Sequence, residues 1–137
     1  MTLQSFYPVL IAEDVGASAQ FYAEHMGFER TFESEWYISL KHRENPAYEL
    51  AVLSPSHETI PDGFRGKSAS GVLLNFEVSD ATAEYERLKE AGVRIVLPLR
   101  DEGFGQRHFI GVGPGGVMLD VIEEIEPSPE FAGQFVS

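Results

Sequence analysis

The amino-acid sequence predicts an α+β fold made of two βαβββ modules that form curved mixed sheets, within a single domain of residues 1–137. The order of one strand, one helix and three strands can be read twice along the chain. Asp14 and Asp80 stand where each helix should begin, Gly27 and Gly92 stand where each should end, and the spacing of the two pairs is nearly equal. Matching landmarks in a matching element order indicate a duplicated unit.

The first module is expected over residues 5–53. "SFYPVLIA" is typical of a strand, Asp14 is a suitable N-cap, and Gly27 is suited to end the helix that follows. "FERTF", "WYISLK" and "YELAVL" are the next strand candidates. Residues 54–70 are rich in Ser, Pro and Gly, which favours a connecting loop. Helical spacing predicts one buried stripe, formed by Val15, Ala19, Tyr22 and Met26.

The second module is expected over residues 71–126. "VLLNFEV" predicts a strand, "ATAEYERLKEA" a helix between Asp80 and Gly92, and "VRIVLPL" a further strand. Residues 127–137 are expected to form a tail, in which Phe131 and Phe135 could dock on a surface. The stripe of the helix is expected to consist of Ala81, Tyr85, Leu88 and Ala91.

The segment "GVGPGG" at 111–116 matches the G-x-G-x-x-G pattern of phosphate-binding loops. Such a loop needs a helix after it, because the helix N-terminus supplies the amide donors. Here "QRHFIGV" precedes the loop and the alternating "VMLDVIEEIEP" follows it, and both segments are typical of strands. We therefore expect a hairpin turn at this place, without a bound phosphate.

Composition limits the classes of protein to be considered. The chain is 43% hydrophobic and contains no cysteine, so it can bury a core and has neither disulfides nor thiolate ligands. The formal net charge of −12 disfavours nucleic acid and would attract a cationic ligand, although solubility alone also explains it. Neither a signal peptide nor a membrane-spanning run is recognised, so we expect a cytoplasmic protein without membrane contact.

Three segments resemble the vicinal oxygen chelate superfamily, which includes glyoxalases, bleomycin-resistance proteins and ring-cleaving dioxygenases. These segments are "YPVLIAEDVGASAQFYAEHMGFE", "NFEVSDATAEYERLKEAGVRI" and "GFGQRHFIGVGPGGVMLDVIEE". The resemblance extends from about residue 5 to 126 and implies the βαβββ fold. It leaves the function open, because this fold serves isomerases, lyases, dioxygenases, thiol transferases and metal-free binding proteins.

Family members that use a metal hold it with side chains from the first and last strand of each half. The resemblance places Tyr7, Glu49, Leu73 and Asp120 in these four positions. Leucine cannot bind a metal and neutral tyrosine is a poor ligand, whereas a catalytic zinc usually has three protein ligands. We therefore expect no metal and no other cofactor, although two carboxylates could hold a hard cation weakly.

The histidines do not restore a metal site. His25, His42 and His57 are expected to face solvent. The alternation of "QRHFI" groups His108 with Gln106 and Ile110, so His108 either lines a cleft or faces solvent, and the two alternatives stay open.

The expected ligand site is an apolar cleft with a few carboxylates and one amide, and it suits an organic ligand with a cationic group. The short sequence segments resemble most those of the bleomycin-resistance type, whose members are metal-free dimers that sequester a cationic antibiotic. "PVL-A-DV" resembles theirs, but Phe104 stands where they usually carry tryptophan. Because the proteins of that type are dimers, the resemblance also implies a homodimer. The expected ligand-binding residues are Tyr7, Trp36, Glu49, Asn75, Phe104, His108 and Asp120.

An enzyme is the alternative hypothesis. A glyoxalase-like lyase or isomerase could use Glu49, Asp120 and His108 for acid–base chemistry, with or without a weakly held divalent metal. A module that serves only dimerisation or regulation is a third class. No nucleophile motif favours one reaction.

Overall fold

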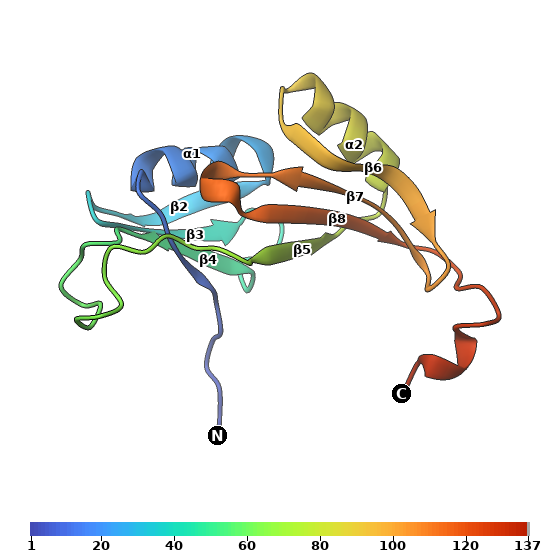
Figure 1. Ribbon diagram of the computed structural model, residues 1–137, viewed down its shortest axis with the longest axis horizontal. Helices are drawn as coiled ribbons and strands as arrows, with labels where there is room; N and C mark the ends of the chain where they lie inside the picture. Colours follow the sequence, from blue (N-terminus) through green and yellow to red (C-terminus); the bar gives the residue numbers. More distant parts are fainter. Residues whose placement is uncertain (137) are drawn as a thin grey trace. The chain divides into compact units, whose positions relative to one another are not determined.

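The computed structural model describes residues 1–136 and divides them into two compact units. Unit 1 contains residues 1–70 together with Pro114–Gly116. Unit 2 contains Gly71–Gly113 and the described chain from Val117 onward. Each unit has one four-stranded mixed sheet and one α-helix, which confirms the α+β class and the two βαβββ modules (Figure 1). The expected boundaries of domain and modules stay predictions.

Unit 1 contains the strands β1 (Val9–Ile11), β2 (Phe28–Glu33), β3 (Tyr37–His42) and β4 (Glu49–Leu53). Their order in the sheet is β1-β4-β3-β2, with β1 parallel to β4 and the other pairs antiparallel. β1 is shorter than the expected strand "SFYPVLIA", because proline cannot donate to a ladder and Pro8 contributes only its carbonyl, which accepts from Ala51 N at 3.1 Å.

Helix α1 (Val15–His25) follows the sequence pattern closely. The side chain of Asp14 accepts a hydrogen bond from Ala17 N at 2.9 Å, and Gly27 ends the turn with φ of +79°. The whole expected stripe is buried: Val15, Ala19, Tyr22 and Met26. Against it pack the core residues Leu10, Ile38, Leu40, Leu50 and Val52 from the sheet.

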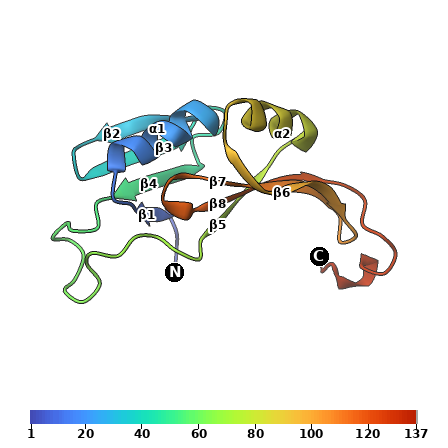
Figure 2. The same ribbon diagram turned by 45° about the horizontal axis from the view of Figure 1, so that its top comes forward.

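Unit 2 contains the strands β5 (Leu73–Glu77), β6 (Arg94–Glu102), β7 (Gln106–Val112) and β8 (Met118–Glu124). Their order in the sheet is β5-β8-β7-β6, with β5 parallel to β8 and the other pairs antiparallel. β6 carries two irregularities in its pairing with β7, one between Ile95 and Leu97 and one between Leu97 and Arg100. Figure 2 shows α2 on one side of these strands.

Helix α2 (Ala81–Glu90) has two N-terminal hydrogen bonds to carboxylates. Asp80 accepts from Ala83 N at 3.0 Å, and Glu123 of β8 accepts from Ala81 N at 3.1 Å. Ala81 and Leu88 are buried as expected, but Ala91 is exposed. The expected stripe was wrong there, because the helix ends at Glu90 and Ala91 is its C-cap.

The glycine-rich segment is a turn, as expected. Pro114–Gly116 forms a short 3₁₀ turn, η1, in which Gly115 and Gly116 have φ of +74° and +83°. Strand β8 begins at Met118, so no helix follows that could bind a phosphate with its N-terminus. Neither α1 nor α2 could cross a bilayer, and no other helix of the described chain could do so.

Candidate functional site

The second sheet has one face that α2 covers and one that we call the distal face. The ring of Phe109 in β7 contacts that of Tyr85 in α2, with centroids 5.1 Å apart, so Phe109 belongs to the covered face. His108 lies on the distal face, because neighbouring side chains in a strand alternate. The cross-strand register adds to the distal face Leu73, Asn75, Glu77, Gln106, Ile110, Met118, Asp120, Ile122 and Glu124.

His108 lies between two carboxylates on the distal face. Its Nδ1 is 2.7 Å from Asp120 Oδ1, and its Nε2 is 2.8 Å from Glu102 Oε2. His108 and Asp120 are each only 6% exposed. Glu102 also accepts from Arg100 Nε at 2.7 Å. These four side chains form a chain of hydrogen bonds, which we call the His108 network.

The geometry of the His108 network determines where its protons lie. An ionised carboxylate only accepts hydrogen bonds, so a His108 ring between two ionised carboxylates donates from both nitrogens and is an imidazolium. Burial by itself lowers the pKa of His108, but the hydrogen bonds to Glu102 and Asp120 outweigh burial and raise the pKa above its ordinary value. The same hydrogen bond from His108, followed by that from Arg100, lowers the pKa of Glu102.

The His108 network shows whether His108 faces solvent and changes the role expected for Asp120. His108 is buried rather than facing solvent. The sequence had suggested that Asp120 would be a carboxylate of an apolar cleft, available to a ligand. Asp120 is instead hydrogen-bonded to His108, so its charge is already balanced inside the protein.

A pair of carboxyl groups lies elsewhere on the distal face. A hydrogen bond with Glu124 and the charge of that neighbour raise the pKa of Glu77. Both residues are exposed, and so is Asn75, which pairs with Asp120 across the parallel strands. Two negative charges so close together repel each other, which makes ionisation of Glu77 less favourable.

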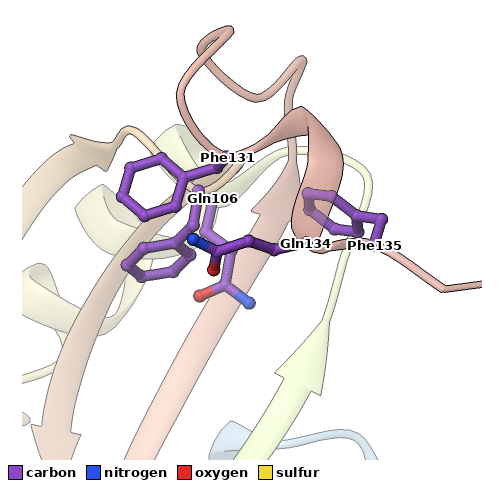
Figure 3. A pocket seen from close by; sticks show the side chains of 5 residues that line it. Gln106, Phe131, Gln134 and Phe135 are labelled. Atoms are coloured by element: carbon purple, nitrogen blue, oxygen red, sulfur yellow. The ribbon is translucent and has the colours of Figure 1, made fainter.

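A pocket of about 280 Å³ lies between the β6–β7 hairpin and the C-terminal tail. Figure 3 shows the side-chain amides of Gln106 and Gln134 pointing toward one another, with the rings of Phe131 and Phe135 on either side. Phe104 of the hairpin also lines this space. We call it the hairpin–tail pocket.

The tail is attached to the hairpin by its backbone. Ser128 N donates to Gly103 O at 2.7 Å, and Ile125 N donates to Gly105 O at 2.9 Å. Phe131 packs edge-on against Phe104, with ring centroids 6.1 Å apart. The expectation that Phe131 could dock on a surface therefore has a definite place, the Gly-Phe-Gly tip of the hairpin.

Unit 1 holds the remaining expected residues. Tyr7 is hydrogen-bonded to Tyr37, which is the main reason that its pKa is raised, and the charge of Glu49 contributes. Trp36 stacks on His57, with centroids 3.9 Å apart and planes 9° from parallel. His57 is thus half-buried against an aromatic ring, whereas it had been expected to face solvent. His25 and His42 are also half-buried, contrary to the same expectation.

The structure brings the expected site residues together in two groups. Asn75, His108 and Asp120 lie on the distal face of unit 2, where Phe104 lines the adjoining pocket. Tyr7 and Glu49 interact in unit 1. That Glu49 and Asp120 share one cleft stays a prediction.

Sequence reasoning missed several functional candidates: Glu77, Glu102, Gln106, Glu124, Gln134 and the site of Phe131. Alternation had grouped Gln106 with His108, and the same alternation puts Glu77 on one face with Asn75, so this was the available signal.

The residues in the positions of the family's metal ligands do not fit a transition metal. Leu73 has no donor atom, and both ring nitrogens of the nearby His108 are bound to carboxylates. Within residues 1–136, no group of three or more His, Asp or Glu side chains has an arrangement that could hold a metal ion.

Comparison with known proteins gives the following result. The family model for the glyoxalase/bleomycin resistance protein/dioxygenase superfamily matches residues 5–121. A solved member from Nocardioides is 20% identical, with a TM-score of 0.74 over 94% of this chain and 89% of its own. One from Sphaerobacter thermophilus is 24% identical, with a TM-score of 0.73 over 90% and 99%.

A glyoxalase-related enzyme from Fulvimarina pelagi is 23% identical, with a TM-score of 0.71 over 89% of each chain. No curated protein matches this sequence significantly. At these identities the solved structures establish the fold, and the function has to be argued from the residues.

Proposed function

Since the chain belongs to the glyoxalase/bleomycin resistance protein/dioxygenase superfamily, we propose that it is a metal-independent member that binds a small organic ligand of cationic character. The binding surface is the distal face of the second sheet. The observation that carries the proposal is the carboxyl pair of Glu77 and Glu124, which are both exposed and close enough to be hydrogen-bonded to each other.

The charges on the distal face explain the preference for a cation. In the His108 network two cations, Arg100 and His108, balance two carboxylates, Glu102 and Asp120. Within residues 1–136, no such cation is among the interactions that raise the pKa of Glu77 beside Glu124. A ligand ammonium group between the two carboxyl groups would relieve their mutual repulsion, whereas an anionic ligand would add to it.

The proposal keeps part of the expected ligand site and shifts its centre. Asn75 lies on the exposed edge strand of the distal face and offers an amide to the same ligand. Asp120 has the role of holding His108 in place. Participation of Tyr7, Trp36 and Glu49 from unit 1 stays a prediction, as do the homodimer and the cytoplasmic location.

A lyase or isomerase that uses Glu49, Asp120 and His108 is the second candidate, and the buried His108–Asp120 hydrogen bond favours it. With a proton on each ring nitrogen, His108 has no lone pair to accept another. It would therefore enter such a reaction as a proton donor. A base would have to come from a carboxylate such as Glu49.

The test is a binding screen with matched charges. Thermal-shift assays and calorimetry should show that aminoglycosides, cationic glycopeptides and amines stabilise the protein, while matched anionic compounds do not. Glu77→Gln and Glu124→Gln should each weaken binding by about 1–3 kcal/mol, the range for a hydrogen bond to a charged group. Treatment with a chelator should leave the affinity unchanged.

Glu86→Gln is the matched control, because Glu86 is an exposed acid on α2 and belongs to the side of the sheet opposite the distal face. It makes the net charge less negative by the same amount and should leave binding intact. Stabilisation by anions alone contradicts the proposal. So does equal weakening by all three variants, which would show that only the overall charge matters.

A further inference from the structure

The hairpin–tail pocket lies beside the carboxyl pair and has a different chemistry. We propose that it is a separate subsite for the aromatic ring of the ligand, so that the preferred ligand is an aryl amine with its ring in the pocket and its ammonium at Glu77 and Glu124. The ammonium half of this inference rests on the proposed function, and the ring half rests on the pocket alone.

The size and lining of the pocket suit a flat ring. Its volume is about 280 Å³, and an apolar cavity of roughly 150 Å³ already accepts benzene. Phe104 comes from the hairpin, and Phe131 and Phe135 come from the tail. Aromatic side chains prefer edge-to-face or offset contacts, which three rings around one space can offer to a fourth.

Two glutamines add a polar contact to this apolar lining. The carboxamides of Gln106 and Gln134 point toward one another in the pocket (Figure 3), and within residues 1–136 neither has a hydrogen-bond partner. Each carboxamide can donate and accept. A ring that carries an amide or a carbonyl group can therefore be recognised by its polar substituent as well as by its face.

The pocket is built before a ligand arrives. The backbone hydrogen bonds from Ser128 and Ile125 hold the tail against the hairpin. Gly103 makes this close approach possible, because a Cβ at this position would lie 3.0 Å from the ring of Phe131. A preformed wall lowers the entropic cost of binding.

The register of the sheet connects the two subsites. Gln106, which lines the pocket, pairs directly with Glu124 across β7 and β8. Side chains that are directly opposite in an antiparallel pair lie about 5 Å apart at Cβ. A ligand with its ring in the pocket and a two-carbon arm can thus reach Glu124 with its ammonium group.

The experiment follows glutamine side-chain signals by NMR of ¹⁵N-labelled protein. The probes are 2-phenylethylamine, which has ring and charge, benzamide, which has only the ring, and n-butylamine, which has only the charge. Both ring-bearing probes should shift the side-chain amide signals of Gln106 and Gln134. Gln20 is an internal control, because it lies in unit 1, bonded to Glu24 and Arg30.

Variants separate the two halves of the ligand. Phe131→Ala and Phe135→Ala should each lower the affinity for 2-phenylethylamine and for benzamide by about tenfold, and leave the affinity for n-butylamine unchanged. Phe135 is 62% exposed, so its replacement tests the ring contact without disturbing a core. Phe64→Ala, which removes an equally exposed ring in unit 1, is the matched control.

The outcomes distinguish the inference from the proposed function. If benzamide leaves Gln106 and Gln134 unchanged, or if Phe135→Ala binds it as well as Phe64→Ala does, the aromatic subsite is refuted. If benzamide binds as expected while n-butylamine shows no dependence on Glu77 or Glu124, the ring subsite stands and the cationic site is refuted.

Discussion

Replacement of Asp120 by asparagine tests the His108 network at its most buried point. Asp120 and His108 are each 6% exposed and joined by a 2.7 Å hydrogen bond. Asparagine keeps the size of the side chain and can still accept from His108 Nδ1 through its oxygen. The substitution therefore removes the charge and little else.

The expected loss can be worked out from this geometry. A hydrogen bond between charged groups contributes about 1.5–3 kcal/mol and a neutral one about 1 kcal/mol. Asp120→Asn should thus lower the free energy of unfolding by about 1–2 kcal/mol near pH 6, where His108 is protonated in the folded and unfolded states. Asp101→Asn, which breaks the exposed ion pair with Arg107, is the control and should cost less.

The loss should depend on pH in a definite direction. The folded protein raises the pKa of His108, so the resulting stability is complete below the unfolded pKa of about 6.5 and disappears as the pH rises through the folded pKa. Asp120→Asn removes one cause of that rise. The difference between the wild type and the variant should therefore be larger near pH 6 than near about pH 9.

Urea unfolding at both pH values, together with NMR titration of the His108 ring, measures this difference. A variant as stable as the wild type near pH 6 would refute the charge-assisted bond. A loss of the same size at both pH values would show that the proton on His108 contributes nothing to it.

Two further predictions concern unit 1. Tyr22→Phe should raise the free energy of unfolding by about 1–2 kcal/mol, because the Tyr22 hydroxyl is buried without a hydrogen-bond partner among residues 1–136. Thermal or urea unfolding measures this change, and a less stable variant would show that the hydroxyl has a partner. Gly27→Ala should destabilise more than Gly92→Ala in the same assay. Both glycines have positive φ, but a Cβ at Gly27 would lie 2.6 Å from His42 Nε2 whereas one at Gly92 would meet open space; equal losses would contradict the role of this contact.

The elements that sequence predicts well are those determined by near neighbours. Asp14 and Asp80 cap their helices through amides three residues away, and Gly27 and Gly92 adopt the positive φ that ends a helix. Strand alternation likewise placed His108 on the same face as Gln106. Each of these depends on a local conformational preference, which short stretches of sequence carry directly.

The partners of His108 could not be predicted in this way. Glu102 reaches His108 from β6, whose irregular pairing around Leu97 and Arg100 shifts the register and changes which side chains share a face. The docking place of Phe131 was equally hidden, because the tail is held by the carbonyl groups of Gly103 and Gly105 and every residue has such a carbonyl. Contacts that depend on a bulge or on backbone acceptors leave little mark on residue type.

The parallel pairs β1–β4 and β5–β8 have a consequence for how the chain folds. In each unit the earliest strand finds its partner only in the latest one, as Val9 does with Ala51 and Leu73 with Met118. Loop closure must therefore be completed before either sheet is whole, and topologies dominated by such distant pairings fold slowly. During synthesis β5 leaves the ribosome before β8, and until β8 follows, the edge of β5 that pairs with it stays unpaired and prone to aggregation.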